Sequence, residues 1–217
     1  MKFDERSLLL YAVTDRQYLS GISLVTAVEQ AITGGATMIQ LREKELADQQ
    51  FIQLAHTVKV ITDHYRVPLI INDNLAVALA GDAAGLHVGQ DDISATEGRS
   101  QLPADKIIGV SVQTVEQALA AEKAGADYLG VGAVFATSSK NDAQSVTVDT
   151  LRQICRAVEI PVVAIGGICE NNVHLLKASG IKGIAVISTI FAKSNIKSAA
   201  SQLYRAAHEM ISDHTGS

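Results

Sequence analysis

The sequence lacks the features that mark membrane-spanning and secreted proteins. Its longest uninterrupted apolar runs are far shorter than the roughly 18–20 residues that cross a bilayer. It has only two cysteines, Cys155 and Cys169, and their spacing fits neither a zinc site nor a redox CxxC pair. Acidic residues occur in the N-terminal stretch MKFDERSLLLYAV, where a signal peptide carries only basic ones. We therefore expect a protein of the reducing cytoplasm.

Blocks of like charge and linker-like segments are also missing. The formal net charge is only −5 and charged residues make up 19% of the 217 residues, a balance that favours small-molecule ligands and predicts no nucleic-acid and no membrane partner. No stretch rich in proline, glycine or serine divides the chain, and 47% of it is hydrophobic, enough for one large core. We expect a single domain over residues 1–217, with a frayed C-terminal tail from about residue 209.

What the chain does contain is a strand-like stretch about every 25 residues. These stretches are continuously apolar, as in parallel strands that are covered on both faces. The sequence predicts eight of them: Leu8–Val13, Thr37–Leu41, Pro68–Ile71, Gly85–Val88, Ile107–Val110, Tyr128–Val134, Pro161–Ile165 and Gly183–Ile187.

Amphipathic segments with helical spacing lie between most of these strands. The clearest is TVEQALAAEKAG at 114–125, where Gly125 stands at the expected helix end. Others are 24–35, 49–65, 148–158 and 171–180, whereas 94–102 is short and polar. Eight strand–helix units favour the α/β class and a closed (β/α)₈ TIM barrel over an open doubly wound sheet of five to seven strands. Apolar positions on the outer helices are compatible with packing on the barrel or with a subunit interface, so a homo-oligomer is a possible assembly.

Polar side chains follow almost every predicted strand. In a (β/α)₈ barrel the carboxyl ends of all strands meet at one mouth, where the active site is built. The residues expected there are Thr14, Asp15, Gln40, Arg42, Glu43, Lys44, Asn72, Asp73, His87, Gln90, Asp91, Asp92, Ser111, Thr137, Ser138, Ser139, Lys140, Gly166, Gly167, Ser188 and Thr189.

Carboxylates follow two neighbouring predicted strands. Asp73 and Asp91 or Asp92 can approach one another, which is unfavourable unless a cation lies between them. One or two carboxylates, with water and phosphate, form the ligand set that Mg²⁺ prefers, and we favour Asp92 over Asp91. An N-cap role for Asp73 is the alternative.

Basic side chains at the same mouth indicate an anionic ligand. Arg42, Lys44 and Lys140 would hold a diphosphate whose charge grows as it leaves. The segments IGGI (165–168) and AVIS (185–188) indicate a second site, for a phosphate monoester, after the seventh and eighth strands. Two anion sites favour displacement of diphosphate from one substrate by a nucleophile on a second, phosphorylated one.

Several of these residues also have simpler interpretations. Asp15 is as expected for a helix cap or turn, and a turn explains Gly166–Gly167 equally well. His87 is either a satisfied core group or a side chain pointing into the mouth. Four further histidines lie on helical patterns and are expected at the surface: His56, His64, His174 and His208.

Seven motifs, in order, carry a family resemblance: QLREK, IIND, GLHVGQDD, GVS, VFATSSK, AIGGI and VIS. Together they resemble thiamine-phosphate synthase (thiamine-phosphate pyrophosphorylase) from about Tyr11 to Phe191. The resemblance implies a (β/α)₈ transferase that joins 4-amino-2-methyl-5-hydroxymethylpyrimidine diphosphate to 4-methyl-5-(2-phosphoethyl)thiazole with one Mg²⁺ per subunit. Thiamine monophosphate and diphosphate would be the products, formed by dissociative displacement.

The resemblance also implies roles for individual residues. Asp73 and Asp92 would bind the metal, and Arg42, Lys44, Ser111 and Lys140 would be catalytic. The pyrimidine diphosphate would contact Gln40, Leu41, Arg42, Glu43, Lys44, Asn72, Ser111 and Lys140, and the thiazole phosphate Thr137, Ser138, Ser139, Gly167, Ile187 and Ser188.

Three positions depart from the family pattern. Ala136 stands in place of a proline and Ser139 in place of a threonine in the FATSSK loop, and Asn74 replaces a frequent arginine. Two rival hypotheses remain: a thiazole tautomerase paralogue of the same fold, or a non-catalytic ligand-binding barrel. Retention of QLREK, Asp73, Asp92 and Lys140 argues against the tautomerase, which would not need a diphosphate site.

Overall fold

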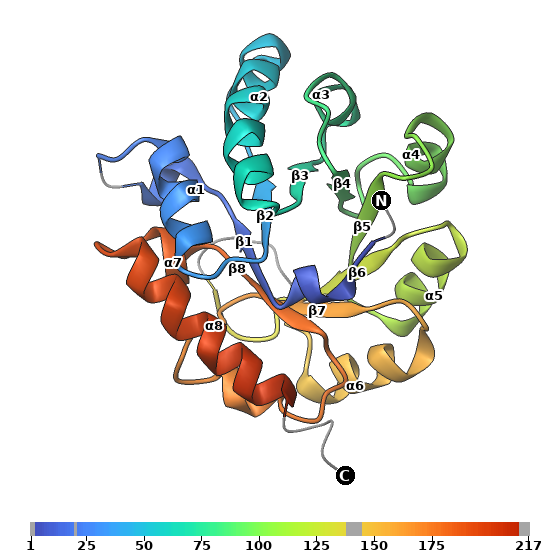
Figure 1. Cartoon of the computed structure of the whole chain (residues 1–217). Helices are drawn as coiled ribbons and strands as arrows, with labels where there is room; N and C mark the ends of the chain where they lie inside the picture. Colours follow the sequence, from blue (N-terminus) through green and yellow to red (C-terminus); the bar gives the residue numbers. More distant parts are fainter. Residues whose placement is uncertain (1–2, 20, 138–144, 213–217) are drawn as a thin grey trace.

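The chain forms a closed barrel of eight parallel strands in sequential order, which the computed structural model describes for residues 3–19, 21–137 and 145–212 (Figure 1). All eight predicted strands are confirmed. Two strands are clearly shorter than predicted: β1 begins at Leu10 and not at Leu8, which lies in a 3₁₀ helix, and β6 stops at Val131 and not at Val134. The strands are β1 Leu10–Val13, β2 Met38–Leu41, β3 Leu69–Asn72, β4 Gly85–Val88, β5 Ile107–Val112, β6 Tyr128–Val131, β7 Val162–Ile165 and β8 Gly183–Val186.

Helices surround the strands as an outer ring, so the fold is the predicted (β/α)₈ barrel (Figure 1). The α-helices are α1 Leu24–Thr33, α2 Asp48–Tyr65, α3 Leu75–Ala80, α4 Ala95–Gln101, α5 Val115–Lys123, α6 Val148–Ala157, α7 Ser188–Phe191 and α8 Ile196–Ser212. Three short 3₁₀ helices complete the described fold: η1 Glu5–Leu8, η2 Arg16–Tyr18 and η3 Val173–Leu176.

Local sequence explains where most helices start and stop. Hydroxyl side chains of Ser23, Ser94, Thr114 and Thr147 cap the amino ends of α1, α4, α5 and α6, and Thr114 forms a full capping box with Gln117. Past the end of α5, Gly125 takes φ +90°, as expected of a glycine after a helix.

Two segments differ from the sequence-based expectation. The stretch 171–180, predicted as a helix, contains only the single 3₁₀ turn η3. The helix α8 continues to Ser212, past residue 209, because Met210 still packs into the core. Burial of an apolar side chain holds the last turn that composition alone marked as frayed.

Two separate hydrophobic layers stabilise the barrel. Alternate strand residues point outward and pack against the helices, forming the larger layer. The other residues point inward and fill the barrel axis, where Tyr11, Met38, Ile70, Tyr128 and Val163 are almost fully buried. Burial on both faces explains why the strands read as continuous apolar runs.

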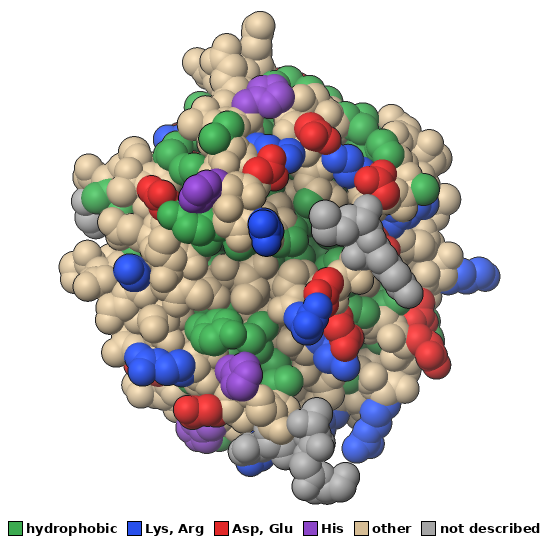
Figure 2. Space-filling view, viewed as in Figure 1, with side chains coloured by type: hydrophobic (Ala, Val, Ile, Leu, Met, Phe, Trp, Pro, Cys, Tyr) green, Lys and Arg blue, Asp and Glu red, His purple; other side chains and the backbone are tan. Residues whose placement is uncertain are grey.

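The surface carries charges of both signs. Figure 2 shows Lys and Arg side chains interspersed with Asp and Glu over the face seen in Figure 1, with no broad field of one sign. In the part of the chain that the structure describes, every helix is too short or too polar to cross a membrane.

One buried polar atom near η3 gives a stability prediction. The hydroxyl of Ser179 is buried and has no hydrogen-bond partner among the described residues. We expect Ser179→Ala to raise the free energy of unfolding by about 1 kcal/mol, because an unsatisfied buried hydroxyl is removed. Urea denaturation measures this. The control is Ser198→Ala on the exposed face of α8, whose free energy of unfolding should rise by only about a few tenths of a kcal/mol, from helix propensity. A loss of stability in Ser179→Ala would mean that the hydroxyl has a partner.

Candidate active site

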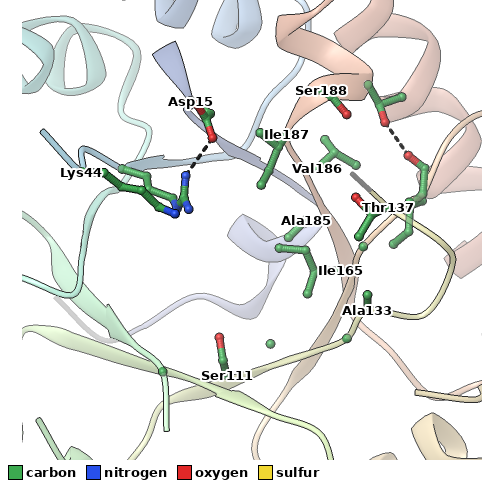
Figure 3. Close-up of a pocket in the computed structure, with 18 of the residues that line it drawn as sticks. Asp15, Lys44, Ser111, Ala133, Thr137, Ile165, Ala185, Val186, Ile187 and Ser188 are labelled. Carbon is green, nitrogen blue, oxygen red and sulfur yellow. Dashed lines mark hydrogen bonds and ion pairs between the residues drawn. The ribbon is translucent and has the colours of Figure 1, made fainter. Parts of the chain in front are cut away.

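A cavity of about 1020 Å³ opens at the carboxyl ends of the strands. Its walls come from the segments after β1, β2, β4, β5, β6, β7 and β8, as expected for the mouth of a (β/α)₈ barrel. Figure 3 shows Lys44 at the left, Asp15, Ile187 and Ser188 along the top, Thr137 at the right and Ser111 at the bottom. A volume of this size is at the upper end for small-molecule sites, so it has room for more than one ligand group.

The loop after β2 is held by the loop after β1. Arg42 donates from its backbone N–H to the hydroxyl of Thr14 (3.0 Å) and from Nη1 to Oδ2 of Asp15 (2.8 Å), and this ion pair is buried. Asp15 also caps η2 by accepting from the N–H of Gln17. The predicted cap role of Asp15 is therefore confirmed, and the same carboxylate positions Arg42 at the cavity wall.

A second ion pair lies beside the first. Arg16 Nε donates to Oε1 of Glu43 at 2.6 Å, and both residues line the cavity. Burial raises the pKa of Glu43 above its usual range, although the hydrogen bond from Arg16 acts in the opposite direction. Lys44, the next residue, is exposed and reaches the cavity from the same loop (Figure 3).

Acidic side chains outnumber basic ones around the described part of the cavity. Arg16, Arg42 and Lys44 face Asp15, Glu43, Glu45, Asp91 and Asp92, so three basic groups oppose five acidic ones. Two of the three basic groups are already paired with carboxylates. An anionic ligand would therefore meet an unfavourable field in this wall unless a further cation is supplied.

The two predicted metal ligands follow neighbouring strands, as expected. Asp73 comes directly after β3, where its N–H donates to the carbonyl of His87 in β4 (2.8 Å) and its carboxylate accepts from the amide of Asn72. Asp92 follows β4, and its Oδ2 accepts from the N–H of Gly89 at 2.7 Å. Asp92 lines the cavity, whereas Asp73 is exposed and outside its described wall.

Asp73 adopts a left-handed backbone conformation, with φ +61°. Asp and Asn tolerate this region better than most residues, which gives a local reason for an Asx residue here. The alternative N-cap role for Asp73 is wrong, because Asn74 caps α3 by accepting from the N–H of Val77. Asn74 also donates to Asp48 at the start of α2, so this departure from the family pattern serves helix packing.

The candidate metal ligands are two carboxylates on neighbouring βα loops, a donor set that a hard cation can use together with water and ligand oxygens. Among the described residues, no group of three or more His, Cys, Asp or Glu side chains could enclose a metal ion. Two carboxylates after adjacent strands remain, with hydrogen bonds that fix their orientation. Mg²⁺ is typically held by one or two carboxylates plus water and ligand phosphate, and so it suits this arrangement.

Glycines shape the opposite wall of the cavity. Gly166 and Gly167 take φ +99° and +63°, and a Cβ on Gly167 would lie 2.3 Å from the carbonyl oxygen of Ala136. Asn172 fixes this turn by donating from Nδ2 to the Gly167 carbonyl (2.9 Å). Both glycines are therefore required by the backbone, as the turn interpretation expected, and the close packing brings Thr137 to the cavity.

The floor of the mouth is a second cavity of about 40 Å³ inside the barrel. Gln40, Asn72, His87 and Ser111 line it, all from inward-pointing strand positions. His87 is buried and hydrogen-bonded at both ring nitrogens, so it is a satisfied core group that also faces a cavity.

Some predicted site residues are placed differently or lie outside the described residues. Alternation along β2 points the side chain of Leu41 outward into the layer between strands and helices, so only its main chain could contact a ligand, and its predicted role stays a prediction. Ser138, Ser139 and Lys140 lie outside the described residues. The remaining predicted residues that line one of the two cavities are Gln40, Arg42, Glu43, Lys44, Asn72, Asp92, Ser111, Thr137, Gly167, Ile187 and Ser188.

Sequence reasoning missed several residues of the site. Arg16 stands in the single 3₁₀ turn η2 and Asn172 in a turn before η3, and both segments are too short for periodicity to indicate direction. Tyr11 and Tyr128 had a usable signal, because each is a polar aromatic at an inward-pointing position of an otherwise apolar strand.

A closed (β/α)₈ barrel with a polar, charged cavity at the carboxyl ends of its strands defines a class: a barrel enzyme whose active site is built from its βα loops. The sequence profile of the family described as thiamine monophosphate synthase matches residues 10–190. The chain belongs to this family, and its relatives named thiamine-phosphate synthase show that it is a transferase of the thiamine-phosphate pyrophosphorylase type.

Individual relatives agree with this assignment. The chain is 54% identical over 194 residues to thiamine-phosphate synthase from Clostridium tetani, covering 89% of this chain and 93% of that protein. It is 46% identical over 209 residues to thiamine-phosphate synthase 2 from Streptococcus pneumoniae serotype 4, covering 96% and 100%. Among solved structures, thiamine phosphate pyrophosphorylase from Pyrococcus furiosus superposes with a TM-score of 0.89 at 38% identity, over 95% of this chain and 98% of that one.

Proposed function

We propose that the protein condenses 4-amino-2-methyl-5-hydroxymethylpyrimidine diphosphate with 4-methyl-5-(2-phosphoethyl)thiazole, giving thiamine monophosphate and diphosphate. The observation that carries this proposal is the composition of one cavity. Arg42, Lys44 and Asp92 line it from the loops after β2 and β4, and Thr137 and Ser188 line it from the segments after β6 and β8. One mouth therefore offers a place for a metal-bound diphosphate and a separate place for a second phosphorylated ligand.

The pyrimidine diphosphate would occupy the side formed by the loops after β2, β3 and β4. Asp15 holds the Arg42 side chain in one rotamer. The remaining guanidinium N–H groups can therefore bind phosphate oxygens with little further loss of side-chain entropy. Lys44 adds an exposed positive charge at the rim. Gln40, Asn72 and Ser111 would bind the ring from the floor.

The thiazole phosphate would occupy the side formed by the loops after β6, β7 and β8. Gly167 allows close approach of the main chain to a ligand, and Thr137 and Ser188 offer hydroxyl groups at the same wall. Ile187 presents an apolar surface next to them, suited to the thiazole ring (Figure 3).

We propose one Mg²⁺ per subunit, held by Asp73 and Asp92. When bound, it would neutralise the charge that develops on the leaving diphosphate. The excess of carboxylates around the described cavity supports this, because a diphosphate brings further negative charge into the same space.

The chemistry needs no protein nucleophile. The bond between the pyrimidine methylene carbon and the diphosphate oxygen breaks, both electrons leave with diphosphate, and the thiazole nitrogen donates its electron pair to the resulting carbocation. Arg42 and Lys44 would stabilise the departing group, while Ser111 and the floor residues hold the ring in line with the thiazole.

An omission assay tests the proposed function. We expect diphosphate to be released, one for each thiamine monophosphate formed, only when both substrates and Mg²⁺ are present. Omission of either substrate should reduce release to the background rate, and chelation of Mg²⁺ should abolish tight binding of the pyrimidine diphosphate in a titration. Conversion of the thiazole phosphate without release of diphosphate would contradict the proposal and favour a tautomerase, whereas binding that is indifferent to Mg²⁺ would favour a non-catalytic barrel.

A further inference from the structure

Five polar side chains form a continuous hydrogen-bonded chain across the barrel interior, beneath the mouth. Gln40 Nε2 lies 2.7 Å from the hydroxyl of Tyr11, which lies 2.8 Å from the hydroxyl of Tyr128. Tyr128 in turn lies 2.9 Å from Nδ1 of His87, and Nε2 of His87 lies 2.9 Å from Oγ of Ser111. The chain therefore joins β2 to β5 through β1, β6 and β4.

Glycines on β5 and β6 provide the space for these hydrogen-bonded side chains. A Cβ on Gly109 would lie 2.1 Å from Cζ of Tyr128 and 2.5 Å from Nδ1 of His87. A Cβ on Gly130 would lie 3.2 Å from Cε1 of His87. The rings of Tyr11 and Tyr128 meet edge to face, and both are almost fully buried. The fold thus excludes apolar side chains where the polar chain runs, although an apolar barrel interior would be simpler to pack.

The protons available on these side chains decide which group donates in each hydrogen bond of the series. Burial raises the pKa of both Tyr11 and Tyr128, so each phenol keeps its proton at neutral pH and has one to give. The hydroxyl of Tyr11 already accepts from the Gln40 amide, and its other partner among the described residues is Tyr128, so Tyr11 donates to Tyr128. Tyr128 must then donate to Nδ1 of His87.

The hydrogen bond that His87 accepts at Nδ1 decides how it interacts with Ser111. A neutral imidazole that accepts at Nδ1 carries its proton on Nε2, and this proton goes to Oγ of Ser111. The hydroxyl proton of Ser111 is then left for a ligand. At the other end, the amide nitrogen of Gln40 is used by Tyr11, so its carboxamide oxygen remains for a ligand. Both end residues line the 40 Å³ floor cavity.

We propose that Tyr11, Tyr128 and His87 are positioning residues that present Ser111 as a hydrogen-bond donor and Gln40 as an acceptor, and thereby select an aminopyrimidine over its oxo counterpart. This inference rests on the proposed function. An aminopyrimidine offers a ring nitrogen acceptor and an amino donor, which match the two ends of the chain. The oxo analogue carries a ring N–H and a carbonyl oxygen, so both contacts would place like groups together.

The tautomer of His87 tests the direction without any measurement of activity. We expect long-range ¹H–¹⁵N spectra of the wild-type protein at neutral pH to show neutral His87 protonated on Nε2, with its signals assigned by comparison with His87→Gln. In Tyr128→Phe the donor to Nδ1 is lost, and a mixture of tautomers should appear. A wild-type His87 protonated on Nδ1, or on both nitrogens, would overturn the proposed direction.

Kinetics with two substrates test the proposed selectivity. We expect the wild-type protein to use the 4-amino pyrimidine diphosphate with a kcat/KM about 10²-fold or more above that of the 4-oxo analogue. Tyr128→Phe and Tyr11→Phe should each reduce this ratio at least about tenfold, mainly through a higher KM for the amino substrate and with kcat changed only a few-fold. Tyr65→Phe, on the outer helix α2, is the matched control and should keep the wild-type ratio.

The outcomes separate this inference from the proposed function. A ratio unchanged in both tyrosine variants, or an equal loss of kcat for both substrates, would overturn the selectivity. Should either variant fail to fold, the other variant and the wild-type tautomer still decide. Absence of diphosphate release by the wild-type protein would instead contradict the proposed function, while the His87 tautomer would remain a test of the hydrogen-bond direction.

Discussion

Replacing Asp92 or Asp73 with asparagine is expected to slow diphosphate release by about 10²–10³-fold or more, with the fold intact. Each substitution keeps the size of the side chain but removes one of the two charges proposed to hold Mg²⁺. Asparagine is preferred to alanine at residue 73, because φ +61° suits asparagine and strains alanine. The rate of diphosphate release, measured over a range of Mg²⁺ concentrations, should show both a lower maximum and weaker dependence on the metal.

Two further substitutions make this experiment specific. Asp91→Asn changes the carboxylate next to Asp92, which lines the same cavity, and we expect it to alter the rate only a few-fold. Asp105→Asn changes an exposed residue that precedes β5, at the opposite end of the barrel, and should leave the rate unchanged. A normal rate in Asp92→Asn together with a large loss in Asp91→Asn would reassign the metal ligand, and normal rates in both Asp73→Asn and Asp92→Asn would remove the proposed metal site.

Replacing Gly183 with alanine is expected to destabilise the protein by about 3 kcal/mol or more. Gly183 begins β8, the strand that closes the barrel against β1. A Cβ at this position would lie 1.8 Å from the carbonyl oxygen of Leu8 and 2.8 Å from Cα of Leu9. Both atoms belong to the main chain, so the clash cannot be relieved by a change of rotamer. Urea denaturation followed by circular dichroism measures the loss.

Gly98→Ala is the matched control for this substitution. Gly98 lies inside α4, and a Cβ there would meet Cδ1 of Ile108 at 3.4 Å, an ordinary van der Waals contact. Because alanine favours a helix more than glycine does, this variant should be as stable as the wild type or more stable by up to about 1 kcal/mol. An unfolding free energy of Gly183→Ala within about 1 kcal/mol of the wild type would show that β8 can move away from η1 at little cost.

Much of the fold could be predicted from the sequence, because the signals for strands and for helices both depend on residues that are close together in the chain. Parallel strands buried on both faces are continuously apolar, so all eight appeared as apolar runs. The helices followed from periodicity and hydroxyl caps, as at Ser94 in the short α4. The prediction failed where local signals conflict with packing: 171–180 has a helical pattern but forms only η3, and the short apolar α3 was missed.

The candidate site was predicted only in part, for a similar reason. Residues that end a strand share the mouth by topology, which placed Arg42, Lys44, Asp92 and Ser188 correctly in the cavity wall. Pairing between loops could not be predicted, because Asp15 and Arg42 are far apart in the chain and irregular segments have no period. The motif match could not show that the Leu41 side chain points away from the cavity, because a motif gives residue identity while strand alternation decides which side chain faces a ligand.

The sequence by itself determined the eight-fold alternation of strands and helices, the polar ring at the strand ends and the family of the chain, because each depends on residue type and spacing along the chain. Only the tertiary structure decided how charges and hydrogen bonds are shared around that ring. It paired Arg42 with Asp15 and Arg16 with Glu43, and it joined Tyr11 and Tyr128 to His87 inside the barrel. The physical reason is that electrostatic and hydrogen-bond energies depend on distance in space, which closure of the barrel sets.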